Sequence, residues 1–193
     1  SITAHANEPL IVAHRGASKN APENTIPAFK LAWKQGADAI EGDFHQTKDG
    51  FIVCIHDKDT NKVSKANLVI KDSTLEDLRS LDVGRHHSRR FKGTVIPTLT
   101  EVLATVPEGK KIYIEIKSDE SIVPALIEEI KESGLKTAQI VVISFDEKAI
   151  HSLKTIAPQY KAMWLSSFKE NASGKITPSI ETVLKTLKQI KAD

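Results

Sequence analysis

The stretch "PLIVAHRGASKNAPENTIPAF", residues 9–29, places a short apolar run directly before His14, Arg15 and Gly16. It then passes through Pro-Glu-Asn-Thr into apolar residues at helical spacing, where Thr25 is placed to cap the helix. A buried strand, a polar loop and an amphipathic helix in this order are typical of α/β proteins with a parallel sheet. The three polar or small residues at the end of the strand suggest that the strand leads into a site.

The rest of the chain repeats this alternation, which predicts an α/β fold with a largely parallel sheet. The apolar runs are Leu10–Ala13, Ala39–Phe44, Phe51–Ile55, Ile112–Ile116, Ile140–Ile143 and Tyr160–Leu165. The expected helices follow the cap at Thr25, carry Ile122, Leu126 and Ile130, carry Ala149, Ile150, Leu153 and Ile156, and follow a cap at Thr177 with Pro178 in the first turn. We expect one domain over residues 1–193.

Two segments interrupt the alternation. Only six residues separate Phe44 from Phe51, too few for a helical crossover, so we expect a hairpin turning at Lys48-Asp49-Gly50. If the turn lies between Lys48 and Asp49, Glu41 lies opposite His56. Residues 57–98 contain no strong strand and are interpreted as an insertion, with a capping box at Ser73-Thr74-Leu75-Glu76 that starts a short helix ending near Leu81. Its basic run, 85–92, is interpreted as a solvated loop in preference to a phosphate-attracting one.

Composition limits the classes of function. The chain has 27 basic and 25 acidic side chains, and the resulting net charge of +2 gives no electrostatic reason to expect a nucleic-acid partner. No apolar run approaches the ~20 residues that span a bilayer, so we expect no integral membrane segment. Ala4-His5-Ala6 has the small-x-small form of a signal-cleavage site. We favour a flexible tail there, but a remnant of an export signal would make the protein periplasmic or secreted, and a cytoplasmic location stays open.

Three acidic residues occupy strand positions where apolar residues are usual. Alternation along 39–44 places Glu41 and Asp43 on one face, roughly 7 Å apart. In the strand 112–117, Glu115 faces away from the isoleucines. Unpaired acids inside a sheet or barrel are costly, and a cation is the usual remedy. Three carboxylates suit one Mg²⁺ or Ca²⁺ ion. Taken singly, each acid is better explained by solvent exposure on an edge strand; the histidines at the strand ends change that balance.

Histidines and basic residues end the neighbouring strands. His14 closes the first apolar run and His56 closes the run 51–55, and either imidazole can accept or donate a proton at neutral pH. Arg15 offers a planar fork for a phosphate or carboxylate, and Lys117 adds a point charge from another strand. An anionic substrate is therefore expected. The single cysteine, Cys54, is interpreted as a small buried residue and not as a nucleophile.

Together these residues resemble the glycerophosphodiester phosphodiesterase family. The matching segments are His14-Arg15-Gly16-Ala17, Pro22-Glu23-Asn24-Thr25, Glu41-Gly42-Asp43, Thr47-Lys48-Asp49-Gly50, His56-Asp57, Ile96-Pro97-Thr98-Leu99, Glu115-Ile116-Lys117 and Ser144-Phe145. The resemblance implies a TIM-barrel-type fold, of the kind also found in phospholipase C-like enzymes, with its site at the carboxyl ends of the strands. It also implies metal-dependent hydrolysis of small glycerophosphodiesters to glycerol 3-phosphate and an alcohol.

The resemblance further implies a role for each matching residue. Glu41, Asp43 and Glu115 look like metal ligands, and His14 and His56 look like the acid and base pair. Two basic residues, Arg15 and Lys117, look like phosphate contacts, and Asn24 looks like a residue that supports the substrate site. Two other functions stay open: a lysophospholipase D-like activity on lipid phosphodiesters, and a catalytically inactive module that binds phosphodiesters.

The length of the chain differs from the family pattern. A full barrel of eight strands usually needs ~200 to 250 residues or more, and family members continue with further strands that we do not find before Asp193. We therefore expect the last two or three barrel strands to be absent from this sequence. Truncation, a further segment, or completion by a second copy in a homo-oligomer would each account for this.

Overall fold

The computed structural model describes residues 9–193, so Ala4-His5-Ala6 lies outside the described residues and export stays a prediction. The chain starts with strand β1 (Val12–His14), helix α1 (Ile26–Lys34) and strand β2 (Ala39–Gln46). The Thr25 side chain accepts a hydrogen bond from the backbone N–H of Ala28, which confirms the expected cap of α1.

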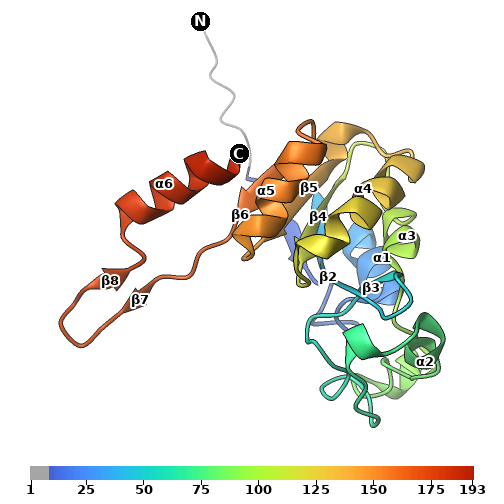
Figure 1. The fold of residues 1–193 in the computed structure, drawn as a ribbon. Coiled ribbons are helices and arrows are strands. Elements are labelled where there is room, and N and C mark those ends of the chain that lie inside the picture. The colour runs from blue at the N-terminus through green and yellow to red at the C-terminus, as the bar shows by residue number, and fades with distance from the viewer. Residues whose placement is uncertain (1–8) are drawn as a thin grey trace, which may run out of the picture.

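Five parallel strands form the main sheet (Figure 1). Their order is β1-β2-β4-β5-β6, where β4 is Lys111–Ile116, β5 is Ile140–Ser144 and β6 is Lys161–Trp164. The sixth strand, β3 (Ile52–Cys54), pairs antiparallel with the last three residues of β2. The predicted α/β fold with a largely parallel sheet is confirmed, and its topology is consistent with part of the expected TIM-barrel-type fold.

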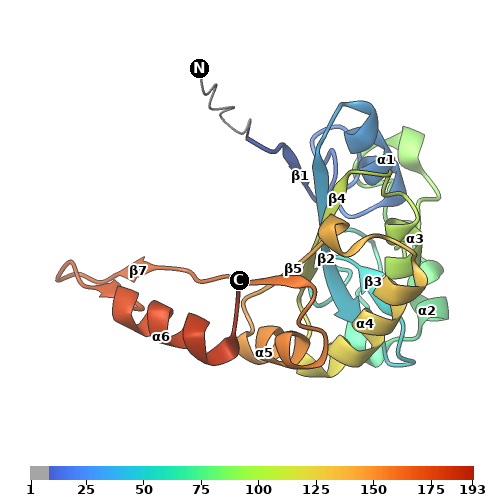
Figure 2. The same ribbon diagram turned by 90° about the horizontal axis from the view of Figure 1, so that it is seen from above.

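Helices cover one face of this curved sheet (Figure 2). They are α1, α3 (Leu99–Leu103), α4 (Val123–Glu132) and α5 (Glu147–Ile156), with the short 3-10 turns η3 (Glu120–Ile122) and η4 (Thr137–Gln139) leading into α4 and β5. The main core lies between the two layers and includes Ile40, Phe44, Ile112 and Ile114, all fully buried. Because side chains alternate along a strand, residues 41, 43 and 115 face the opposite side of the sheet.

The hairpin between β2 and β3 forms as expected, but its predicted register is wrong. Phe44 pairs with Cys54 and Gln46 with Ile52, one residue away from the register that would place Glu41 opposite His56. The turn is the cause: the loop has three residues, 48–50, and Gly50 adopts a left-handed φ of 90°. The backbone N–H of Thr47 donates to the carbonyl of Phe51, which closes the loop around Asp49.

Residues 57–98 form an ordered layer with an apolar cluster of its own. This segment contains η1 (Ile70–Asp72), α2 (Leu75–Arg79) and η2 (Arg89–Phe91). The cluster, which we call the insertion core, consists of Val53, Ile55, Val63, Ile70, Leu78, Val83 and Ile96. The capping box of α2 uses Thr74 and Asp77, one residue later than predicted, because the Ser73 hydroxyl donates to the carbonyl of Val69 instead.

The last segment differs most from expectation. A hairpin of β7 (Lys169–Glu170) and β8 (Ile176–Thr177) precedes α6 (Ile180–Ile190), and this arm extends away from the sheet (Figure 1). The cap of α6 is Ser179 and not Thr177, because Thr177 is paired with Lys169 in the hairpin. Pro178 consequently lies before the helix. Within residues 9–193, no helix combines the length and apolar character that crossing a bilayer requires.

Candidate active site

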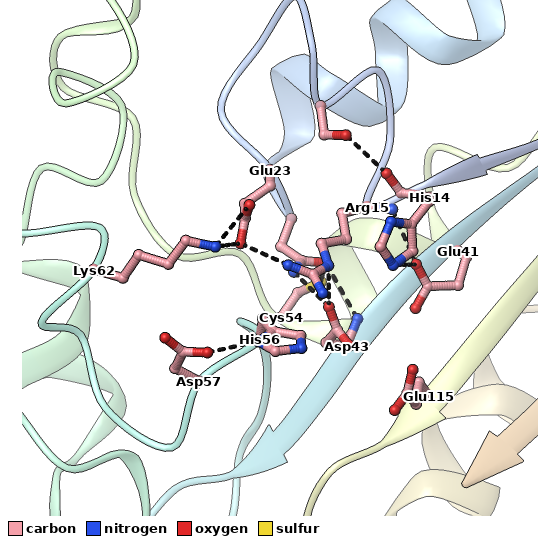
Figure 3. Close-up of polar contacts among 12 residues, drawn as sticks. His14, Arg15, Glu23, Glu41, Asp43, Cys54, His56, Asp57, Lys62 and Glu115 are labelled. Carbon is pink, nitrogen blue, oxygen red and sulfur yellow. Dashed lines mark hydrogen bonds and ion pairs between the residues drawn. The ribbon is translucent and has the colours of Figure 1, made fainter. Parts of the chain in front are cut away.

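Three buried carboxylates meet on the open face of the sheet (Figure 3). Glu41 and Asp43 come from β2, and Glu115 of β4 lies opposite Asp43 in the parallel register. One ligand oxygen from each residue lies within 4.8 Å of the others. The exposed fractions of these residues are 5%, 0% and 8%. The strand alternation inferred from the sequence therefore brings all three acids together.

The carboxylate oxygens are not fully satisfied by the protein. Glu41 Oε1 and Asp43 Oδ1 are buried and have no hydrogen-bond partner among the described residues. Burial, followed by the neighbouring Asp43 and Glu115 charges, raises the pKa of Glu41 to about 8. Buried carboxylates that lie close together and have oxygens without a hydrogen-bond donor fit a hard divalent cation. Mg²⁺ and Ca²⁺ are the usual choices. The residues present thus fit the expected metal.

The loop after β1 brings Arg15 against this cluster. Its backbone N–H donates to Glu41 Oε2 at 2.9 Å, and its Nε lies 3.2 Å from Asp43 Oδ2. Arg15 has a φ of 57° and Gly16 a φ of 77°, so two successive residues adopt the left-handed conformation. A Cβ atom on Gly16 would lie 2.7 Å from the backbone carbon of Ala28. The loop is therefore held tightly against the start of α1.

Asn24 holds Asp43 in place and points away from solvent. Its Nδ2 donates to Asp43 Oδ2 at 2.8 Å, and its Oδ1 accepts from the Asp43 backbone N–H at 3.1 Å. The Cys54 thiol also donates to Asn24 Oδ1 at 3.3 Å. Burial raises the pKa of that thiol well above its usual value, as expected for a small buried residue and not for a nucleophile. Asn24 is 3% exposed and has a φ of 57°.

Lys117 completes the charged rim on the side of β4. Its Nζ lies 2.7 Å from Glu115 Oε1 and 3.4 Å from Asp43 Oδ1. Burial opposes the charged form of Lys117, but the hydrogen bond to Glu115 and the charge of Asp43 prevail and raise its pKa. A cationic amine therefore borders the carboxylates at neutral pH.

The two histidines lie on different sides of the cluster. His14 is paired with Glu41 in the register of β1 and β2, and its Nε2 lies 3.9 Å from Glu41 Oε2. His56 follows β3, and its Nδ1 lies 2.6 Å from Asp57 Oδ1. Since a carboxylate only accepts, the Asp57 contact assigns the proton to Nδ1 and leaves Nε2 available. The predicted juxtaposition of Glu41 with His56 is thus replaced by one of Glu41 with His14.

Sequence reasoning assigned no contacts to Glu23 and Lys62. Glu23 Oε1 lies 3.2 Å from an Arg15 guanidinium nitrogen and 2.9 Å from Lys62 Nζ (Figure 3). A chain of charges therefore runs from the insertion through Glu23 and Arg15 to Asp43. Glu23 stands within the Pro-Glu-Asn-Thr motif and could have been noticed, whereas no sequence pattern marks Lys62.

Comparison with known proteins supports the resemblance. Residues 14–189 match the family model described as the glycerophosphoryl diester phosphodiesterase family. The chain is 42% identical over 159 residues, 79% of its length, to the glycerophosphodiester phosphodiesterase of Caldanaerobacter subterraneus subsp. tengcongensis, of which it covers 64%. It is 32% identical over 180 residues, 85% of its length, to a Bacillus subtilis protein of the same name, of which it covers 61%. The chain thus spans less than two thirds of these relatives.

Solved structures show the same fold. A glycerophosphodiester phosphodiesterase from Agrobacterium tumefaciens has a TM-score of 0.73 at 32% identity, covering 80% of this chain and 65% of its own. An Oleispira antarctica phosphodiesterase, solved in complex with the product sn-glycerol-3-phosphate, has a TM-score of 0.84 at 26% identity. That comparison covers 95% of this chain and 72% of the other.

Proposed function

The chain belongs to the glycerophosphoryl diester phosphodiesterase family, and we propose from this premise that it hydrolyses glycerophosphodiesters to sn-glycerol 3-phosphate and an alcohol. The observation that carries the proposal is the buried cluster of Glu41, Asp43 and Glu115, with His14 near Glu41 and His56 on the other side of Asp43 (Figure 3). The names of the relatives and the product bound to the Oleispira antarctica enzyme support the same substrate class.

We propose that the three carboxylates hold one divalent cation, Mg²⁺ or Ca²⁺. The support for this assignment is that Glu41 Oε1 and Asp43 Oδ1 are buried and accept no hydrogen bond from the protein. When bound, such a cation neutralises charge on the phosphoryl oxygens and so makes a phosphodiester a better electrophile. Asn24 would keep the Asp43 carboxylate in its binding orientation, because both ends of its amide are already bonded to Asp43.

His14 and His56 would move the protons of the reaction. One imidazole takes the proton from the attacking oxygen as the new P–O bond forms. The other gives a proton to the departing alkoxide as the old P–O bond breaks, so the proton count is balanced. Each transfer typically contributes roughly 10²- to 10⁴-fold in rate. The Asp57 carboxylate supports this role for His56, because it fixes the ring and leaves Nε2 available.

Arg15 and Lys117 would bind the phosphate of the substrate. Both carry charge at the edge of the carboxylate cluster, from the β1 loop and from the end of β4. Their positive charges would also stabilise the negative charge that grows on the phosphoryl oxygens in the transition state. The Glu23 and Lys62 contacts hold the guanidinium in place.

The test measures release of sn-glycerol 3-phosphate from glycerophosphocholine with Mg²⁺, with Ca²⁺ and with a chelator. We expect release only with a cation, and a loss of at least about 10²-fold in His14→Ala and in His56→Ala. His151→Ala, an exposed histidine on α5, is the matched control and retains activity. Release that persists in the chelator, or in both histidine variants, would refute the proposal.

A further inference from the structure

A groove of about 430 Å³ adjoins the carboxylate cluster and is rich in lysine. It lies between the ends of β2 and β4 on one side and the insertion on the other. We call it the lysine groove; its lining includes His45, Thr47, Lys48, Lys58, Lys71, Lys117, Ser118, Asp119 and Ser121. Four of these side chains are lysines and only one is a carboxylate. Of the four lysines, only Lys117 has a role in the proposed function, as a phosphate contact.

Three lysines of the groove form no close ion pair. Among residues 9–193, no carboxylate oxygen lies within 4.0 Å of the Nζ atoms of Lys48, Lys58 or Lys71. The one acid of the lining, Asp119, accepts a hydrogen bond from the Ser121 backbone N–H at 2.9 Å. A concave surface on which charges of one sign outnumber the other concentrates the electrostatic field and attracts the opposite charge. The lysine groove therefore favours an anion.

The backbone under these lysines is fixed by hydrogen bonds. The Lys48 N–H donates to the carbonyl of Ser73 at 2.9 Å, which ties the β2–β3 turn to the insertion. The Lys58 carbonyl accepts from the Ile70 N–H at 2.9 Å, which holds position 58 beside the start of η1, where Lys71 lies. The lysines thus project from ordered backbone, so their proximity does not depend on a flexible loop.

Lys117 connects the lysine groove with the carboxylate cluster. It lines the groove, and its Nζ contacts both Glu115 and Asp43. The Lys117 backbone N–H donates to the carbonyl of Phe44 at 2.9 Å, which fixes this junction to β2. Lys117 therefore borders both the lysine groove and the carboxylate cluster, which makes the two neighbouring sites.

We infer that the lysine groove binds a second anionic group, carried by the alcohol part of the substrate. This inference rests on the proposed phosphodiesterase function. The glycerol part of such a substrate has only hydroxyl groups, so any second charge belongs to the alcohol. Lysine binds phosphate as a point charge, and three lysines around one groove suit a phosphate monoester or a second phosphodiester. The substrate class is therefore glycerophosphodiesters with an anionic alcohol, in preference to those with a neutral or cationic one.

Two compounds that differ by one phosphate test the inference: glycerophosphoinositol and glycerophosphoinositol 4-phosphate. We expect kcat/KM to be about tenfold higher for the 4-phosphate, the size of a few exposed ion pairs. This ratio should fall to about 1 in the Lys58→Gln/Lys71→Gln double variant. It should also fall at about 1 M NaCl, where the Debye length is ~3 Å. Lys185→Gln/Lys188→Gln on α6 removes the same charge elsewhere and keeps the ratio.

Two results would overturn the inference: a ratio near 1 in the unaltered chain, or a raised ratio that survives in Lys58→Gln/Lys71→Gln. If neither these compounds nor glycerophosphocholine is hydrolysed, the proposed function fails, but the groove is still tested. Calorimetry then gives the two Kd values in the same variants, and the same tenfold preference and its loss are expected. Equal Kd values for the two compounds would overturn the inference in that case.

Discussion

Replacement of Asn24 tests whether the buried carboxylate cluster depends on one amide. Asn24→Ala removes the donor to Asp43 Oδ2 and the acceptor of the Asp43 backbone N–H. Asp43 has no exposed surface, so water cannot replace these two hydrogen bonds. A buried charged group that loses its donor costs about 1.5–3 kcal/mol. Alanine in the left-handed conformation of position 24 costs about 1–2 kcal/mol more. We therefore expect Asn24→Ala to lower the free energy of unfolding by about 3 kcal/mol or more.

Urea unfolding measures this loss, and two further variants divide it. Asn24→Gly accepts the left-handed backbone and should recover about 1 kcal/mol relative to Asn24→Ala. Asn67→Ala, an exposed asparagine of the insertion, should stay within about 0.5 kcal/mol of the unaltered chain. The reasoning is refuted if Asn24→Ala also stays within about 0.5 kcal/mol. Equal stability of Asn24→Ala and Asn24→Gly would refute the backbone part alone.

Three other predictions concern Glu41, Gly16 and Lys62. The pKa of Glu41 is raised from 4.5 to about 8, so folding favours its protonated form, and without metal this contribution is complete below pH 4.5 and lost as pH rises through 8. Glu41→Gln should therefore flatten the fall of Tm between about pH 5 and pH 8 in chelator, and a parallel fall in both proteins would contradict this. Gly16→Ala should destabilise the chain by about 1–3 kcal/mol in urea, more than Gly36→Ala, where a Cβ meets nothing within 4 Å. Lys62→Met should raise KM several-fold with little change in kcat, because it loosens Arg15 through Glu23, whereas Lys65→Met, exposed in the same segment, should change neither. Equal KM values in the two lysine variants would argue against the charge chain.

The sequence predicted those features that depend on local periodicity. Alternation along β2 and β4 was sufficient to place Glu41, Asp43 and Glu115 on one face, since a strand has a period of two residues. The cap at Thr25 follows from local backbone chemistry in the same way. These features need no knowledge of distant parts of the chain.

The features that were missed depend on tertiary contacts. The register of β2 and β3 follows from the left-handed conformation of Gly50, together with contacts from Lys48 and Asp49 to residues 73 and 75. No local pattern distinguishes this three-residue loop from a two-residue one. The parallel pairing that sets His14 beside Glu41 is equally non-local. Thr177 satisfied the rules for a helix cap, but its pairing in a hairpin overrode that preference.

The separation between the main core and the insertion core affects local unfolding of the molecule and its tolerance of substitutions. Local unfolding usually involves contiguous units with their own apolar contacts, and residues 57–98 are one such unit, whose apolar cluster meets the sheet at Val53 and Ile55. Lys58, Lys62 and Lys71 belong to this unit, whereas the carboxylates belong to the sheet. Hydrogen exchange of backbone N–H groups should therefore be faster in residues 57–98 than in β2 and β4. Substitutions in the insertion, including those at the lysine groove, should therefore cost the strands that carry the carboxylate cluster little stability.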